Sequence, residues 1–397
     1  MSSWGHDFRP DYLILGDAIE ALGHPPVLAM TATGAAPVRD EIVERLGLVN
    51  QRLIARGFDR PNLHVRVVRH ESDAEKRRAV VEQVEKLERP GLVYVATRAD
   101  TERYSGALAR AGIHSAGYNG GMPGKDREDV YEGFIGDTLD VVVATSAFGM
   151  GIDKPNVRFV VHAAVTDSLD SYYQEIGRAG RDGLPAAATL HYRPEDFALS
   201  RFFESGAPDE AQVKRVFGAI KAAPGISRAD LAHTLDTHER AIGRMLGLLD
   251  EAGVITIDAD RLTAAPVSAT MAARKATAHA GTRQRIEHSR AAMMQEFAET
   301  RSCRRQVLLG YFGENLPLPC GNCDTCDSGS AYEVAALSAA AAFVLDAHVA
   351  HKNWGAGVVM RVEPDRITVF FDQEGYRVLS LADVERHHLL TLAGPAN

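Results

Sequence analysis

Residues 140–162 read Asp-Val-Val-Val-Ala-Thr-Ser-Ala-Phe-Gly-Met-Gly-Ile-Asp-Lys-Pro-Asn-Val-Arg-Phe-Val-Val-His, and this stretch decides the fold of the chain. Its short apolar runs at 141–144 and 159–161 predict buried parallel strands, because a strand covered on both faces has no polar side with which to alternate. A polar loop follows each run. In open α/β sheets the site lies outside the carboxyl ends of the strands, so we expect residues 145–154 and 167–181 to line one cleft.

A second stretch, residues 174–183, reads Gln-Glu-Ile-Gly-Arg-Ala-Gly-Arg-Asp-Gly. Arg178 and Arg181 are three residues apart in what we expect to be a helix entered from Ser171. Two cations on one helix face suit an anionic ligand. The alternative is that both arginines lie on the surface in salt bridges. For an isolated Gly-Arg-x-Gly-Arg pattern, this would be the favoured interpretation.

Together, the two stretches resemble motifs V and VI of superfamily 2 helicases, and in detail those of the RecQ family of DNA helicases. The matching segments, Ala-Phe-Gly-Met-Gly-Ile-Asp-Lys-Pro and Ser-Tyr-Tyr-Gln-Glu-x-Gly-Arg-Ala-Gly-Arg-Asp-Gly, are long and contiguous. The resemblance implies that ATP, with Mg²⁺, binds between two RecA-like lobes. It implies catalytic roles for Gln174, Arg178 and Arg181, with Arg181 as the arginine finger. The nucleotide contacts that it implies come from Gly149, Gly151, Asp153, Arg178 and Arg181.

Further segments match the RecQ pattern and indicate DNA contacts. Residues 1–11 place aromatic side chains beside a cation, which suits stacking on nucleic-acid bases, and they resemble the aromatic-rich loop of the family. Met30-Thr31-Ala32-Thr33 resembles motif III. Thr97-Arg98 resembles motif IV, where small polar groups would hold a DNA phosphate. The DNA-binding residues expected from these segments and from motif V are Trp4, His6, Phe8, Arg9, Thr97, Arg98 and Thr145.

The 397 residues do not contain the adenine-reading glutamine, the phosphate loop or the acidic box of the family. The nearest approach to a phosphate loop, residues 120–126, fails because Asp126 replaces the hydroxyl needed for magnesium and Pro123 removes a backbone N–H. We therefore expect an N-terminally truncated chain that does not hydrolyse ATP in this form, with residues 1–58 as a remnant of the first RecA-like lobe.

Two domains are expected before the cysteines. Alternating helix and strand patterns predict a second RecA-like lobe over residues 59–206, with a parallel sheet. Residues 207–270 then show three amphipathic helices, the second begun by a capping box at Ser227, and a two-stranded wing, which together describe a winged helix. Its third helix, expected to begin at Thr237, would face DNA, although many winged helices bind only protein. The residues that this helix would present are His238, Arg240 and Arg244.

The four cysteines of the chain have the spacing C-x16-C-x2-C-x2-C. We expect a cytoplasmic protein, because the start has no signal-peptide pattern and no apolar run could span a membrane. Disulfides are disfavoured there, so the spacing predicts a closed, structural zinc site. The surrounding sequence resembles the RecQ zinc-binding subdomain, here residues 271–328, with one helix from Arg283 to Leu309. The predicted Zn²⁺ ligands are Cys303, Cys320, Cys323 and Cys326.

The charge distribution and the C-terminal segment complete the prediction. Net charge is −9, but residues 261–305 hold nine Lys or Arg against three Glu, which indicates a localised DNA-binding face. Residues 329–347 are expected to be a linker. Alternating apolar residues then predict a hairpin within a small β-barrel over residues 348–397, similar to SH3- or Tudor-like modules. Trp354 is either a ligand platform or, as we favour, part of the core.

The predicted fold class is thus α/β: a RecA-like lobe, a winged helix, a four-cysteine zinc-binding subdomain and a small β-barrel. The resemblance implies a helicase that unwinds DNA from 3′ to 5′ in repair and recombination. Its partners would be single-stranded and branched DNA and a protein at the barrel, without a membrane. Two alternatives remain, a non-catalytic DNA-binding fragment and a transcription regulator that uses the winged helix.

Overall fold

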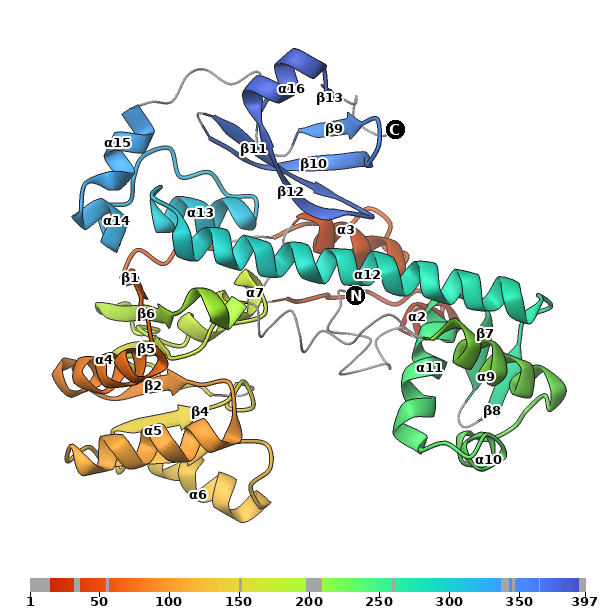
Figure 1. The fold of residues 1–397 in the computed structure, drawn as a ribbon, viewed down its shortest axis with the longest axis horizontal. Helices are drawn as coiled ribbons and strands as arrows, with labels where there is room; N and C mark the ends of the chain where they lie inside the picture. Colours follow the sequence, from red (N-terminus) through yellow and green to blue (C-terminus); the bar gives the residue numbers. More distant parts are fainter. Residues whose placement is uncertain are drawn as a thin grey trace.

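A long helix, α12 (Ala269–Glu299), runs through the middle of the computed structural model of this chain (Figure 1). A parallel-sheet domain lies beneath one end of α12, a three-helix domain lies beneath the other, and an antiparallel sheet lies above it. No helix among the described residues is long and apolar enough to cross a bilayer. The structure describes residues 15–31, 36–54, 57–149, 152–197, 209–258, 261–336, 343–344, 347–363 and 365–392.

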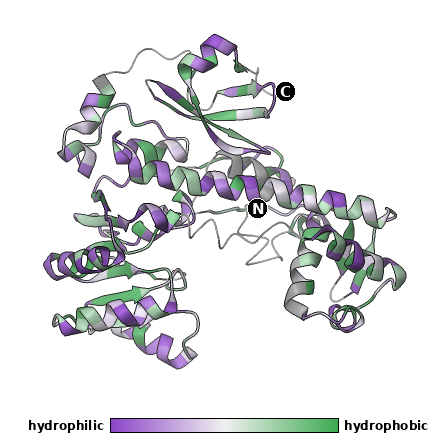
Figure 2. Cartoon of the chain, viewed as in Figure 1, coloured by the Kyte–Doolittle hydropathy of each residue, from purple (hydrophilic) through white to green (hydrophobic). Residues whose placement is uncertain are grey.

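The parallel-sheet domain has six strands in the order β1-β6-β5-β2-β4-β3. The two strands predicted from the apolar runs are present as β4 and β5, and every residue in both is buried. Figure 2 shows these apolar strands between helices that carry hydrophilic side chains. The strands are β1 (Leu63–Arg69), β2 (Gly91–Tyr94), β3 (Ser115–Tyr118), β4 (Val141–Ala144), β5 (Phe159–His162) and β6 (Ala186–Tyr192).

Helices cover both faces of this sheet. Side chains of α4 (Asp73–Lys86) and α5 (Arg98–Arg110) pack on one face, in a core with β2, β4 and β5. Side chains of α6 (Gly124–Ile135) and α7 (Leu169–Ile176) pack on the other face. This second core continues into the zinc-binding segment, so the lobe and that segment form one packed unit.

The expectation that Arg178 and Arg181 share a helix face is wrong. Helix α7 begins after its N-cap Ser168 and ends at Ile176, so both arginines lie in the turns that follow. Gly180 adopts a φ of +59°, which takes the backbone out of the helical region, and a Cβ there would lie 2.4 Å from the Asn62 amide. The arginines are therefore held by a compact turn.

The three-helix domain has its own core and ends in a two-stranded hairpin, the arrangement of a winged helix. Ser227 caps the second helix as predicted, by accepting a hydrogen bond from the Asp230 N–H. The third helix begins at Glu239 with His238 as N-cap, two residues later than expected. Its elements are α9 (Glu210–Ala222), α10 (Arg228–Thr234), α11 (Glu239–Glu251), β7 (Ile255–Asp258) and β8 (Arg261–Ala264).

The single helix predicted from Arg283 to Leu309 is also wrong, because the structure has two helices there. Helix α12 ends at Glu299, and α13 (Arg304–Tyr311) begins after Cys303. Between them the Thr300 backbone is extended, with ψ at 148°, and the Thr300 hydroxyl accepts a hydrogen bond from the Ser302 N–H. This break turns Cys303 toward the other cysteines.

Two short helices follow the cysteines. Helix α14 (Asp324–Asp327) begins directly after Cys323, and α15 (Ser330–Ala336) lies within the predicted linker. The start of that linker is therefore ordered as a helix. Residues 337–342 and 345–346 of the same stretch lie outside the described residues.

Residues 348–392, which we call the C-terminal β-domain, form an antiparallel sheet in the order β12-β11-β10-β9-β13. The predicted hairpin is confirmed as β10 paired with β11. Trp354 is half-buried, stacked on His351 with ring centroids 4.1 Å apart, and Arg377 lies over its ring. The elements are β9 (His348–His351), β10 (Gly355–Val362), β11 (Arg366–Phe371), β12 (Gly375–Ser380), α16 (Leu381–His387) and β13 (Leu390–Leu392).

Two helices precede the parallel-sheet domain, α2 (Leu15–Ala21) and α3 (Ala36–Arg45). The described residues around them leave large apolar side chains exposed, among them Leu28, Met30 and Ile54. The predicted site residues that lie outside the described residues are Trp4, His6, Phe8, Arg9 and Gly151, together with the side chains of Arg240 and Arg244.

Candidate nucleotide, DNA and zinc sites

The carboxyl edge of the parallel sheet gathers three polar segments. Strand β4 lies between β2 and β3, so Thr97 and Thr145 follow neighbouring strands. Thr97 caps α5 by accepting a hydrogen bond from the Asp100 N–H at 3.1 Å. Arg98 is exposed, and its guanidinium lies over Gly121, where a Cβ would come within 2.3 Å of the Arg98 Nη1. This edge thus presents two hydroxyls and one exposed cation.

Asn119 holds the turn beneath Arg98. Its side chain is buried, its Nδ2 donates to the Thr101 hydroxyl at 3.2 Å, and its Oδ1 accepts from the Gly121 N–H at 3.0 Å. A buried amide with both ends bonded fixes the local backbone. Asn119 therefore acts here as a structural brace for the glycine turn.

Arg178 is a buried cation, only 9% exposed, at the base of the loop after β4. A Cβ on Gly149 would lie 3.3 Å from the Arg178 Nη2, so the two residues touch. Arg178 also hydrogen bonds with the Tyr94 hydroxyl, which itself donates to the Phe148 carbonyl at 2.9 Å. Burial raises the pKa of Tyr94, so this hydroxyl stays protonated at neutral pH. Arg178 is thus tied to the loop between β4 and β5.

Arg181 is exposed and differently bound. Its Nη1 donates to the Ile152 carbonyl at 2.8 Å and to the Asp153 carboxylate at 2.9 Å. The Asp153 side chain is 88% exposed, and exposed ion pairs contribute only about 0–1 kcal/mol. An incoming anion can therefore compete with Asp153 for this guanidinium at little cost. Gln174 is half-buried on α7, before the turn that holds both arginines.

A buried hydrogen bond beside this site was not predicted from the sequence. His162, at the end of β5, lies 2.7 Å from the Glu175 carboxylate of α7, and both side chains are buried. The imidazole also stacks on Tyr94 at 5.3 Å between ring centroids. The pair joins the ends of β5 and β2 to α7. The sequence does contain one signal for this contact, because His162 is a polar residue at the end of an apolar run.

The four cysteines converge, although they come from two separate segments, the start of α13 and residues 320–326. All four sulfur atoms lie within 4.8 Å of one another. The Sγ of Cys320 is 3.9 Å from that of Cys326, and the Sγ of Cys323 is 4.0 Å from that of Cys303. A tetrahedral zinc with Zn–S bonds of about 2.3 Å requires S–S distances of about 3.8 Å. The cluster therefore fits Zn²⁺ with closed coordination.

The crowded thiols also shift one another's pKa values in opposite directions. Hydrogen bonds from Cys303 and Cys320 lower the pKa of Cys323, whereas burial raises that of Cys326 to about 12. A divalent metal that binds such thiols displaces their protons into solvent, and the binding energy becomes folding energy. Bound zinc would supply a cross-link between α13 and the segment 320–326.

Polar contacts attach the zinc segment to the edge strand β1. The Asp324 carboxylate accepts from the Val67 N–H at 3.0 Å and from the Arg304 Nε at 2.9 Å. The buried Arg305 donates to the Leu63 carbonyl at 3.0 Å, and Cys323 forms a bridge with Val65. The metal cluster therefore stabilises the lobe that carries Arg178 and Arg181.

The basic face predicted in residues 261–305 is only partly available to DNA, because several of its arginines link parts of the protein. Arginine side chains suit such roles, since their planar fork bonds carboxylates and carbonyls well. The internal pairs are Arg285–Glu374, Arg301–Glu333, Arg304–Asp324 and Arg305–Asp59.

Two protein-family models match the segments that carry these residues. The helicase conserved C-terminal domain matches residues 75–183, which include Thr97, Arg178 and Arg181. The RecQ zinc-binding family matches residues 267–327, which include α12 and all four cysteines. The chain belongs to the RecQ family of superfamily 2 helicases. Within this family, it carries a winged helix before the zinc site and the C-terminal β-domain after it.

Curated relatives support the RecQ assignment over most of the chain. The ATP-dependent DNA helicase RecQ of Pasteurella multocida is 35% identical over 82% of this chain and 40% of its own length. The probable ATP-dependent DNA helicase RecS of Bacillus subtilis is 32% identical over 82% of this chain and 63% of its own length. The chain thus spans about two fifths of the RecQ relative and about three fifths of RecS.

Proposed function

We propose that this RecQ-family chain supplies the motif VI half of an ATP site and acts in ATP-dependent DNA unwinding. The observation that carries the proposal is the pair of arginines at one sheet edge. Arg178 is buried and fixed against Gly149, whereas Arg181 is exposed and held by a hydrogen bond to the Ile152 carbonyl and a weak pair with Asp153. Such a pair provides one anchored cation and one cation that can move.

The two arginines would play different parts. Arg181 would leave Asp153 and place its guanidinium against the transferring phosphoryl group, as an arginine finger worth about 10³–10⁵ in rate. Arg178 would keep the loop after β4 in place. Gln174, Gly149, Gly151 and Asp153 would complete the nucleotide contacts, with ATP and Mg²⁺ bound across from them.

A nucleotide-binding lobe would complete this site. The exposed apolar side chains of Leu28, Met30 and Ile54, each at least 73% exposed, are typical of a surface covered by packing. A first RecA-like lobe packed on this segment would bury them and bring a phosphate loop toward Arg181. We infer that the N-terminal segment serves this contact.

DNA would bind along the same sheet edge. Thr97 and Thr145 offer hydroxyls and Arg98 an exposed cation, the groups that hold a phosphate backbone without reading sequence. We propose single-stranded and branched DNA as substrates, 3′ to 5′ unwinding, and a role in repair and recombination. Further contacts are proposed for Trp4, His6, Phe8, Arg9, His238, Arg240 and Arg244.

Two further parts of the proposal concern partners and location. The C-terminal β-domain would also hold a protein partner on its outer face. Thiolate ligands for zinc need a reducing compartment, which supports a cytoplasmic location.

The test is DNA-stimulated ATP hydrolysis and strand separation. We expect the chain to hydrolyse ATP when a RecQ first lobe with its phosphate loop is supplied, fused or in trans. Lack of hydrolysis in every combination would contradict the helicase proposal. If DNA binding alone survives, and shows sequence preference, the winged-helix regulator becomes the better account.

A further inference from the structure

The helix that leads to the motif VI turn is connected to the C-terminal β-domain. Asp170, on the first turn of α7, is buried and accepts a hydrogen bond from the Tyr311 hydroxyl of α13. Tyr311 stacks on Tyr376 of β12, with ring centroids 4.8 Å apart and planes at 25°. The Tyr376 hydroxyl also interacts with Tyr311 and with the charge of Asp170. Three side chains thus link α7 to the β-domain.

A cation completes this buried cluster. Arg290 of α12 interacts electrostatically with Asp170, Tyr311 and Tyr376, and solvent does not reach its Nε. Burial raises the pKa of Asp170, while the charge of Arg290 opposes that rise. Removing one member of such a cluster leaves its partner buried without compensation. The cluster therefore resists partial opening.

The turn between β11 and β12 is pressed onto α12. Gly375 has a φ of +69°, and a Cβ there would lie 2.1 Å from the Ser289 hydroxyl and 3.1 Å from the Ile286 Cα. Nearby, the Arg285 Nε donates to the Gln373 carbonyl at 2.9 Å. Backbone this close to a helix leaves no room for a shifted orientation of the β-domain.

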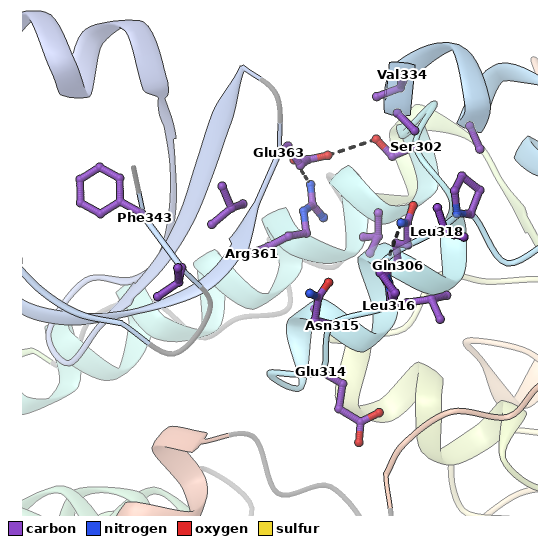
Figure 3. Close-up of a pocket in the computed structure, with 18 residues that line it drawn as sticks. Ser302, Gln306, Glu314, Asn315, Leu316, Leu318, Val334, Phe343, Arg361 and Glu363 are labelled. Carbon is purple, nitrogen blue, oxygen red and sulfur yellow. Dashed lines mark hydrogen bonds and ion pairs between the residues drawn. The ribbon is translucent and has the colours of Figure 1, made fainter. Parts of the chain in front are cut away.

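A second contact fixes the other side of the β-domain. Arg361 of β10 reaches toward α13 and pairs with Glu363, which accepts from the Ser302 hydroxyl at 3.1 Å (Figure 3). Arg361 also pairs with Glu296 of α12. A cavity of about 530 Å³ adjoins this network and is lined by residues of the zinc-binding segment and of the C-terminal β-domain. The β-domain is therefore held at two separated points along α12 and α13.

We propose that the C-terminal β-domain is a fixed part of the motor, and that Tyr376 is a positioning residue for the turn that carries Arg178 and Arg181. Tyr376 holds Tyr311, and Tyr311 holds Asp170 at the start of α7. Six residues at about 1.5 Å each place the end of α7, Ile176, about 9 Å from Asp170, and the turn with Arg178 follows directly. A short rigid helix transmits a tilt at one end to the other. This proposal rests on the nucleotide role proposed above for those arginines.

Hydrogen exchange of the full chain tests the proposal without ATP. Tyr376→Ala should speed amide exchange in residues 169–181 at least tenfold, while exchange in β4 and in the winged helix stays unchanged. The matched control is Val384→Ala, a buried position in the separate core of the β-domain, which contains neither Tyr311 nor Tyr376. It should speed exchange within the β-domain but not in residues 169–181.

A conservative variant keeps the test decisive if Tyr376→Ala does not fold. Tyr376→Phe keeps the ring stack and removes only the hydroxyl, so exchange in residues 169–176 should rise about threefold. Unchanged exchange there in both variants, with faster exchange confined to the β-domain and α12, would overturn the proposal. The exchange rates are measured without ATP, so a chain that does not hydrolyse ATP would give the same result. The test therefore distinguishes failure of this proposal from failure of the proposed ATP role.

Discussion

Replacing Asp324 should destabilise the zinc segment far more than replacing a comparable surface carboxylate. Asp324 accepts from the Arg304 Nε at 2.9 Å, the Arg304 Nη2 at 3.2 Å, the Val67 N–H at 3.0 Å and the Thr325 N–H at 2.8 Å. Arg304 is only 6% exposed. Asp324→Ala would leave that guanidinium buried without its carboxylate, which costs about 3–5 kcal/mol.

The matched control is Glu333→Ala. The Arg301–Glu333 pair has the same 2.9 Å distance, but its side chains are 72% and 69% exposed. An exposed pair of this kind contributes about 0–1 kcal/mol. Both substitutions lie in the same segment and remove one negative charge, so they differ mainly in burial.

The assay is zinc release into a chromogenic chelator during urea titration, which reports on this segment alone. With a urea slope of about 2 kcal/mol per M, Asp324→Ala should lower the midpoint by about 2 M and Glu333→Ala by less than about 0.5 M. Asp324→Asn, which keeps an acceptor without the charge, should fall between them. Equal midpoints for the two alanine variants would refute the reasoning from burial.

Three further predictions follow from the sites. Zinc removal by a strong chelator under reducing conditions should unfold residues 300–328, because the metal contributes on the order of 10 kcal/mol to folding; retained protease resistance there would contradict a structural zinc. Burial lowers the pKa of His191 to about 3 from the ordinary 6.5, so the unfolded state binds more protons between these values and stability falls as pH drops below about 6.5. His191→Gln should flatten that dependence in urea midpoints measured from pH 7.5 to 5, and an unchanged slope would exclude His191 as its source. Arg98→Ala should weaken binding to all single-stranded sequences alike and reduce the salt slope of binding by about 1, as measured by fluorescence anisotropy; an unchanged slope would remove Arg98 from the phosphate contacts.

The sequence predicted elements that are specified locally. Val141 to Ala144 and Phe159 to Val161 could be assigned because strands buried on both faces are continuously apolar. The cysteine ligands could be assigned because the spacing C-x16-C-x2-C-x2-C fits a four-cysteine zinc site. In both cases the signal lies within the residues themselves.

Features set by distant contacts were not predicted. The helical pattern continues across Thr300, and only the cysteine cluster and its attachment to β1 explain the break there. Arg178 and Arg181 were assigned to a helix although Gly177 and Gly180 flank them, and these glycines were the overlooked signal. Arg304 and Arg305 were counted as a basic surface, but burial against Asp324 and Leu63 depends on tertiary packing alone.

The same limit applies to the C-terminal β-domain. Its hairpin follows from alternating apolar residues in β10 and β11, which is a local pattern. Its attachment to α7 depends on Tyr311, Arg290 and Tyr376, which lie on three different elements and carry no shared motif. The sequence therefore predicted a linker followed by a small barrel. In the structure the β-domain packs on α12 and α13.

The central claim is that Arg181 serves as a mobile cation for ATP hydrolysis, and one measurement tests it most directly. The chain is combined with a RecQ first lobe that carries the phosphate loop, and DNA-stimulated ATP turnover is compared for the unaltered chain, Arg181→Ala and the surface control Arg301→Ala. Arg181→Ala should lower turnover by about 10³ or more with DNA affinity unchanged, whereas Arg301→Ala should match the unaltered chain. Equal turnover for Arg181→Ala and the unaltered chain would contradict the account.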